Sequence, residues 1–98
     1  MIFAFSSPID YNEGVSLKLY LVSCDLLQPG DYHSLKERLR ALGATAVMDR
    51  QWALRSTFTA IELKDILKEY LDGGDRLVVA EVGTEWASRR ALINLGTL

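Results

Sequence analysis

The order of the hydrophobic patterns along this chain constrains its possible fold more than any other feature of the sequence. Residues 17–25 (LKLYLVSCD) are rich in large apolar residues and contain neither Gly nor Pro, which indicates a β-strand. Pro29-Gly30 then marks a turn, and Asp31 stands at the position of a helix N-cap. The apolar residues of the helix that follows recur every three or four positions, at Tyr32, Leu35, Leu39 and Leu42. We expect this helix to end at Gly43.

A second set of patterns follows in a related order. Residues 44–49 and 51–57 form two short extended runs, which indicate a hairpin, although Arg50-Gln51 lacks the Asn-Gly chemistry of the best-marked turns. Thr59 and Glu62 have the spacing of a capping box. The predicted helix carries its apolar face at Leu63, Ile66, Leu67, Tyr70 and Leu71. Residues 72–75 (DGGD) then break it, and residues 76–83 predict a last strand.

The predicted order is therefore strand, helix, strand, strand, helix, strand. Residues 17–49 and 51–83 are halves of 33 residues each, without a residue-level repeat between them. Two βαβ units joined by a hairpin make an α+β, ferredoxin-like βαββαβ antiparallel sheet with two helices on one face. We expect residues 1–98 to form a single domain, with 17–83 as its core, 84–98 as a C-terminal tail, and 1–16 as an N-terminal extension or an added edge strand.

Both faces of this sheet are apolar. In the first strand Leu19 and Leu21 alternate with Tyr20 and Val22, and residues 76–83 are apolar at both parities as well. Because the helices cover one face only, the other face predicts a homodimer formed through the sheet, in which the tail is exchanged or packed at the interface. The alternative is that the tail folds back over this face with its apolar residues, Trp86, Leu92, Ile93 and Leu95.

Charge and cysteine content exclude several classes of protein. The net charge of -2 is not that of an autonomous nucleic-acid-binding protein, so contact with RNA or DNA requires a local basic patch. Cys24 is the only cysteine, which excludes an internal disulfide and a thiolate zinc cluster and agrees with a reducing cytoplasm. The apolar run at residues 1–5 is too short for a signal peptide, and no run is long enough for a membrane span. The sequence predicts a cytoplasmic protein without membrane contact.

Asp25 is the first candidate for a functional residue. It ends the first predicted strand, where such sheets often place functional groups. The plain alternative is that Asp25 is a turn or cap residue, because one carboxylate does not make a catalytic site. A dimer that brought two copies of Asp25 together could bind a divalent cation such as Mg²⁺.

Arginines form the second candidate set. Arg50, Arg55 and Arg76, together with Arg89-Arg90 in the tail, could bind nucleic-acid phosphates. Alternatively these side chains form a solvated face with ion pairs to neighbours such as Asp49. The start of the first helix, with Asp31 and His33, favours anions, or else Asp31 is simply a cap and His33 a solvated residue. Neither glycine fingerprint of a phosphate-binding loop is present, so we expect no bound nucleotide cofactor.

Two other uses of this fold are excluded by their motifs. The third strand of an RNA-recognition motif carries stacking aromatic residues in a basic, glycine-containing signature, whereas residues 51–58 read QWALRSTF. A metal chaperone of this fold needs paired cysteines, and the chain has Cys24 alone. Trp52 and Trp86 are interpreted as packing residues.

A series of short motifs resembles a known family. In order they are LVSCDL, PGDYHSL, a GA pair before the second strand, MDRQWALRST, TAIEL, LDGGDRLVVAEV and Glu85-Trp86. Over about residues 17–87 the chain resembles the CRISPR-associated Cas-two-like proteins, and within them the SinR-like branch, which is related to the virulence-associated protein D ribonucleases. It departs from the family pattern at Cys24, where a Tyr is usual, and in RQWAL, which lacks the common Ser.

The resemblance implies both a fold and a function. It implies a ferredoxin-like homodimer joined through its sheets, in which Asp25 holds Mg²⁺ or Mn²⁺ at the twofold axis and supports hydrolysis of RNA or DNA phosphodiesters. Many members of the family serve instead as non-catalytic scaffolds of larger protein assemblies. The alternative function is therefore a dimeric scaffold or regulatory module in which Asp25 only ends the strand.

Overall fold

The structure is a computed structural model that describes residues 17–27 and 32–98. The predicted N-terminal extension, the Pro29-Gly30 turn and the Asp31 cap lie outside the described residues. The elements follow the order β1 (Lys18–Asp25), α1 (Tyr32–Ala41), β2 (Thr45–Met48), β3 (Gln51–Ser56), α2 (Ala60–Leu67) and β4 (Arg76–Val82). Two short 3₁₀ turns complete them, η2 (Lys68–Tyr70) and η3 (Leu95–Thr97).

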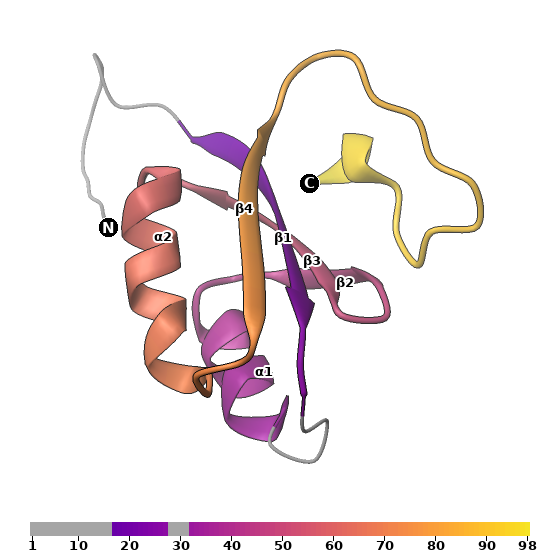
Figure 1. Ribbon diagram of the computed structural model, residues 1–98. Helices are drawn as coiled ribbons and strands as arrows, with labels where there is room; N and C mark the ends of the chain where they lie inside the picture. Colours follow the sequence, from indigo (N-terminus) through magenta and orange to yellow (C-terminus); the bar gives the residue numbers. More distant parts are fainter. Residues whose placement is uncertain (1–16, 28–31) are drawn as a thin grey trace.

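The four strands form one sheet in the order β2-β3-β1-β4. Each neighbouring pair is antiparallel, and the register sets Ser23 of β1 opposite Gln51 of β3 and Val78 of β4. Both helices lie on the same side of this sheet (Figure 1). The predicted α+β, ferredoxin-like arrangement is therefore confirmed.

The main core lies between the helices and the sheet. Its most deeply buried side chains come from the helix-facing positions of the strands and from one face of each helix: Val22, Leu35, Leu39, Leu54, Leu63 and Leu67. Trp52 joins this core at 5% exposure, which agrees with its interpretation as a packing residue. Each such side chain contributes about 1.5–3 kcal/mol by leaving water. The helical periodicity seen in the sequence is thus the pattern of this core.

The helix ends follow the local signals of the sequence. Gly43 has a φ of +89°, its N–H donates to the Arg40 carbonyl at 2.9 Å, and the Ala44 N–H donates to the Leu39 carbonyl at 2.9 Å. This is a Schellman motif, in which glycine adopts the left-handed conformation at no steric cost. At the start of α2, the Thr59 hydroxyl accepts from the Glu62 N–H at 3.1 Å, and the Glu62 carboxylate accepts from the Thr59 N–H at 2.8 Å. The predicted capping box is present.

The second helix is shorter than its apolar pattern predicts. The α-helix ends at Leu67, and the chain tightens into η2, so that Tyr70 is 40% exposed while Leu71 packs against the core. A 3₁₀ turn advances three residues per turn instead of 3.6, which rotates the positions after Leu67 away from the face set by α2. The expected place of Tyr70 on the buried face is therefore wrong.

The other face of the sheet is covered in part by the tail. A second, smaller core joins Leu19, Val47 and Ala53 to Leu95, with Ala91, Ile93 and Leu98 packed around them. The tail lies on the side of the sheet opposite the helices (Figure 1). Of the four tail residues expected to cover this face, Ile93 and Leu95 do so, whereas Trp86 is 38% and Leu92 68% exposed. The tail thus folds back over this face, but incompletely.

Part of the open face stays uncovered along β1 and β4. Val78 is 61% exposed, Ala80 is exposed, and Leu21, which lies opposite Ala80, is half-buried. We call Leu21, Val78 and Ala80 the open strip. None of the helices in residues 17–27 and 32–98 has the length and apolar character needed to cross a membrane.

Candidate functional site

Asp25 lies at the exposed carboxyl end of β1. Because β1 and β4 are antiparallel, the end of β1 faces the start of β4, and Asp25 is paired in register with Arg76. The Arg76 Nη1 atom lies 3.2 Å from the Asp25 Oδ2 atom, and the two side chains are 82% and 67% exposed. Such an exposed ion pair stabilises a protein by about 0–1 kcal/mol. Both side chains are therefore available to a ligand at little energetic cost.

In the described residues of one copy, Asp25 is not part of a preformed metal site. Within the described ranges, no three His, Cys, Asp or Glu side chains gather closely enough to hold a metal ion. Asp25 has the strand parity of Leu19 and Leu21, so it belongs to the open face of the sheet. Asp49 and Asp75 also lie near this end of the sheet but do not form such a group with Asp25, so we expect a second carboxylate beside Asp25 to come from a second copy of the chain.

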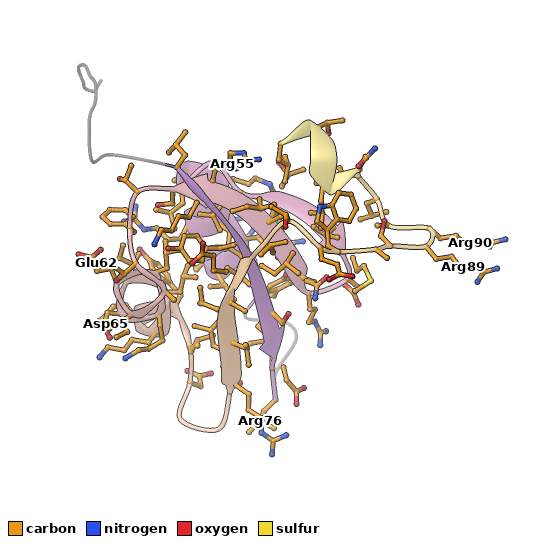
Figure 2. The ribbon with its side chains drawn as sticks, turned by 90° about the horizontal axis from the view of Figure 1, so that it is seen from above. Arg55, Glu62, Asp65, Arg76, Arg89 and Arg90 are labelled. Atoms are coloured by element: carbon orange, nitrogen blue, oxygen red, sulfur yellow. The ribbon has the colours of Figure 1, made fainter. Side chains whose placement is uncertain are left out.

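The structure separates the three candidate arginines. Arg76 and Arg50 belong to the end of the sheet that carries Asp25, since the Arg50 carbonyl accepts from the Cys24 N–H at 3.1 Å. Arg55 lies at the opposite end, where its Nε donates to the Leu98 carbonyl at 2.7 Å (Figure 2). Arg89 and Arg90 project from the tail, well away from Arg76 (Figure 2). Of the three, Arg76 alone has its side chain beside Asp25, because the Arg50 side chain turns toward Tyr32 on the helix side of the sheet.

A cavity beside Arg50 holds a group of charges that the sequence did not reveal. We call it the cationic cavity; its volume is about 190 Å³, and it lies between the outer face of α1 and the β2–β3 hairpin. Its lining includes three basic and two aromatic side chains: Lys36, Arg40, Arg50, Tyr32 and Trp52. The signal that could have found it is the i, i+4, i+8 spacing of Tyr32, Lys36 and Arg40, which places them on one side of a helix.

The aromatic side chains of this cavity are held by hydrogen bonds. The Trp52 Nε1 donates to the Tyr32 hydroxyl oxygen at 2.5 Å, which joins β3 to the first turn of α1. Burial raises the pKa of the Tyr32 phenol and that of the neighbouring Cys24 thiol, so both groups are neutral at neutral pH. Cys24 is therefore a packing residue with a weak sulfur contact, 3.6 Å from the Arg50 carbonyl oxygen, and not an activated nucleophile.

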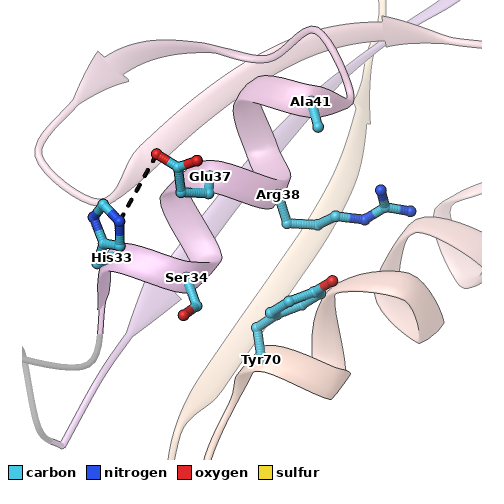
Figure 3. A pocket seen from close by; sticks show the side chains of 6 residues that line it. All are labelled: His33, Ser34, Glu37, Arg38, Ala41 and Tyr70. Atoms are coloured by element: carbon cyan, nitrogen blue, oxygen red, sulfur yellow. Dashed lines mark ion pairs between the residues drawn. The ribbon is translucent and has the colours of Figure 1, made fainter.

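The start of α1 forms a shallower cavity of about 340 Å³ against η2. His33 is 79% exposed, and its Nε2 lies 3.9 Å from a Glu37 carboxylate oxygen. Arg38 from α1 and Tyr70 from η2 both line this cavity (Figure 3). This arrangement agrees with the interpretation of His33 as a solvated first-turn residue, while the expected cap at Asp31 falls outside the described residues.

Three features of the described chain thus carry the functional argument: the Asp25–Arg76 pair, the open strip and the cationic cavity. The first two share the open face of the sheet, and the third lies on the helix side of the hairpin. Comparison with protein-family models, with curated proteins and with solved structures finds no match for this chain.

Proposed function

We propose that two copies of this chain pair through the open face of the sheet and that the dimer hydrolyses phosphodiester bonds of RNA or DNA. The observation that carries this proposal is the position of Asp25, an exposed carboxylate at the end of the face that also bears the open strip. Pairing about a twofold axis that runs parallel to β1, between the two sheets, would bring two Asp25 side chains to one end of the interface. The resemblance to the Cas-two-like family supports the same arrangement.

A pair of Asp25 carboxylates has the donor chemistry that Mg²⁺ or Mn²⁺ requires. Mg²⁺ is commonly held by one or two carboxylates and keeps several waters, so one carboxylate from each copy is a sufficient protein contribution. When bound, such an ion supplies an activated water and stabilises the negative charge that develops on the oxygen atoms of the phosphate group. Asp25 would hold the ion, and the exposed Arg76 guanidinium would leave Asp25 and donate hydrogen bonds to the substrate phosphate.

The second candidate function is a non-catalytic dimeric scaffold or regulatory module within a larger assembly. The Asp25–Arg76 ion pair favours it, because this contact satisfies the carboxylate without a metal ion. In that case Asp25 ends the strand and fixes the start of β4, and the open strip is simply an interface.

A cleavage assay separates the two functions. Purified full-length protein is incubated with single- and double-stranded RNA and DNA, with Mg²⁺, Mn²⁺ or a chelator, beside the Asp25→Asn variant. Asp65→Asn is the matched control, because Asp65 is an exposed carboxylate on α2 that pairs with Lys64 and Lys68. We expect metal-dependent cleavage that Asp25→Asn lowers by about 100-fold or more and Asp65→Asn leaves unchanged. Cleavage that Asp25→Asn does not alter would exclude the proposed site, and no cleavage of any substrate would favour the scaffold.

A further inference from the structure

The cationic cavity gathers positive charge from two separate elements. Lys36 and Arg40 come from α1, and Arg50 comes from the turn between β2 and β3. The cavity volume of about 190 Å³ is several times the ~30 Å³ that one water molecule occupies in the liquid. It therefore has room for a phosphate group together with water.

An aromatic ring lies beside each of these three cations. The Lys36 Nζ and the Arg50 Cζ lie 5.2 and 5.8 Å from the centroid of the Tyr32 ring, and the Arg40 Cζ lies 5.7 Å from that of Trp52. A cation–π contact orients a basic side chain without cancelling its charge, unlike an ion pair. Two cations at one ring also repel each other, and an anion bound between them would offset that repulsion.

The acidic groups near the cavity leave it positively charged. Asp49 is the carboxylate in its lining, against three basic side chains. Arg40 has a second carboxylate nearby, but its Nη1 lies 3.9 Å from Glu37, in an exposed pair that water screens. Because Tyr32 and Cys24 remain neutral at neutral pH, the wall beneath the cations adds no negative charge.

The backbone of Arg50 is held in an uncommon conformation. Its φ is +61°, a left-handed value that residues with a side chain rarely adopt. The Cys24 N–H donates to the Arg50 carbonyl at 3.1 Å and fixes this turn to the end of β1. The Arg50 Nε is buried and has no hydrogen-bond partner among the residues described, so this donor is satisfied only when the side chain shifts to meet an acceptor such as an anionic ligand. Strained residues of this kind often lie at binding sites.

We propose that the cationic cavity is a binding site for a phosphate group, either free or carried by a nucleotide or a nucleic acid, held by Lys36, Arg40 and Arg50. Guanidinium groups match phosphate oxygens with paired, charge-assisted hydrogen bonds, and the lysine adds a point charge. The Trp52 ring is too deeply buried for a base to stack on it, so recognition is limited to the phosphate. The site does not include Asp25 and requires no metal ion. Phosphate binding at this site can therefore be tested independently of the proposed hydrolysis.

Nuclear magnetic resonance provides a direct test, because the chain has two tryptophans with separate indole N–H signals. Trp52 lines the cavity, whereas Trp86 lies in the tail and serves as an internal control; a Trp86→Phe variant assigns the two signals. Full-length protein in a chelator is titrated with inorganic phosphate, adenosine monophosphate or a short single-stranded oligonucleotide. We expect saturable movement of the Trp52 signal without movement of the Trp86 signal. The ligand with the lowest dissociation constant identifies the source of the phosphate as free anion, nucleotide or nucleic acid.

Matched variants test two of the three cations, Arg40 and Arg50. Arg50→Asn removes the charge with a residue that tolerates a positive φ, and Arg40→Gln removes a charge from α1; each is expected to raise the dissociation constant about tenfold, which corresponds to about 1.4 kcal/mol. Arg89→Gln removes the same charge from the exposed tail and is expected to leave binding unchanged. Asp25→Asn should bind as well as the natural chain even if all nuclease activity is lost. Failure of every ligand to move the Trp52 signal, or an equal weakening by Arg89→Gln, would overturn the proposal.

Discussion

The two faces of the sheet are covered in different ways. On one face, α1 and α2 bury Leu35, Leu39, Leu63 and Leu67 to 1% exposure or less. On the other, the cover is a tail with little regular structure, which buries Leu95 to 5% but leaves Val78 61% exposed. The helix face therefore provides most of the stability of the domain. The open face retains exposed apolar surface, which a dimer interface requires, and an exposed carboxylate, which a metal site requires.

Paired truncations give the largest expected difference between the two faces. Leu39→Ala should lower the free energy of unfolding by about 3 kcal/mol or more, because the helices and sheet around it cannot close the cavity. Leu95→Ala should lower it by less than half as much, since the tail can detach while the sheet and helices stay folded. Urea denaturation of both variants measures the two values. Equal losses would show that the tail is as integral to the fold as the helices are.

A smaller effect is expected at the start of α2. Thr59→Ala removes the side chain that accepts from the Glu62 N–H, and it should lower the free energy of unfolding by about 1 kcal/mol. Hydrogen exchange should increase mainly in the first turn of α2, while the amides of the tail exchange as before. A similar increase in the tail would mean that the two faces unfold as one unit.

The smallest effect concerns the pH dependence of stability at the end of the sheet where β1 ends and β4 begins. The Asp75 carboxylate accepts from the Leu27 N–H at 2.9 Å and the Asp72 N–H at 2.8 Å, and these bonds lower its pKa. Because the folded-state pKa is depressed, the resulting stability is present above the ordinary carboxyl value of 3.8 and is lost as the pH falls through the folded-state pKa. The urea midpoint of the natural chain should thus fall more than that of Asp75→Asn between neutral pH and about pH 3. An equal fall in both proteins would show that Asp75 does not contribute to the pH dependence of stability.

Local signals explain why much of the fold was predictable. The capping box at Thr59, the terminating glycine at Gly43 and the alternation in β1 depend on residues that are close in sequence, so they can be recognised without the tertiary structure. The end of α2 was less predictable, since Tyr70 fits the helical period but lies in the 3₁₀ turn η2, and the helix-breaking glycines, Gly73 and Gly74, come only after it.

The site depends on contacts that the sequence does not display. Asp25 could be selected because it ends a strand, whereas its partner Arg76 follows from the register of β1 and β4. The helical period sets Lys36 and Arg40 apart from the apolar face of α1 but does not place them in a cavity, because the ring beside Arg40 comes from β3. The tail has no periodic pattern, so its place on the sheet follows only from the apolar surface available to it there.

Sedimentation equilibrium of the 98-residue chain shows whether the open face is an interface. We expect a mass of twice the 11.0 kDa of one chain, and a return to 11.0 kDa in Val78→Glu, which places a charge on the open strip. Ile61→Glu is the matched control, because Ile61 is 69% exposed on α2, on the other side of the sheet, and this variant should remain a dimer. A natural chain that sediments as a monomer, or a dimer that Val78→Glu does not weaken, would contradict the account.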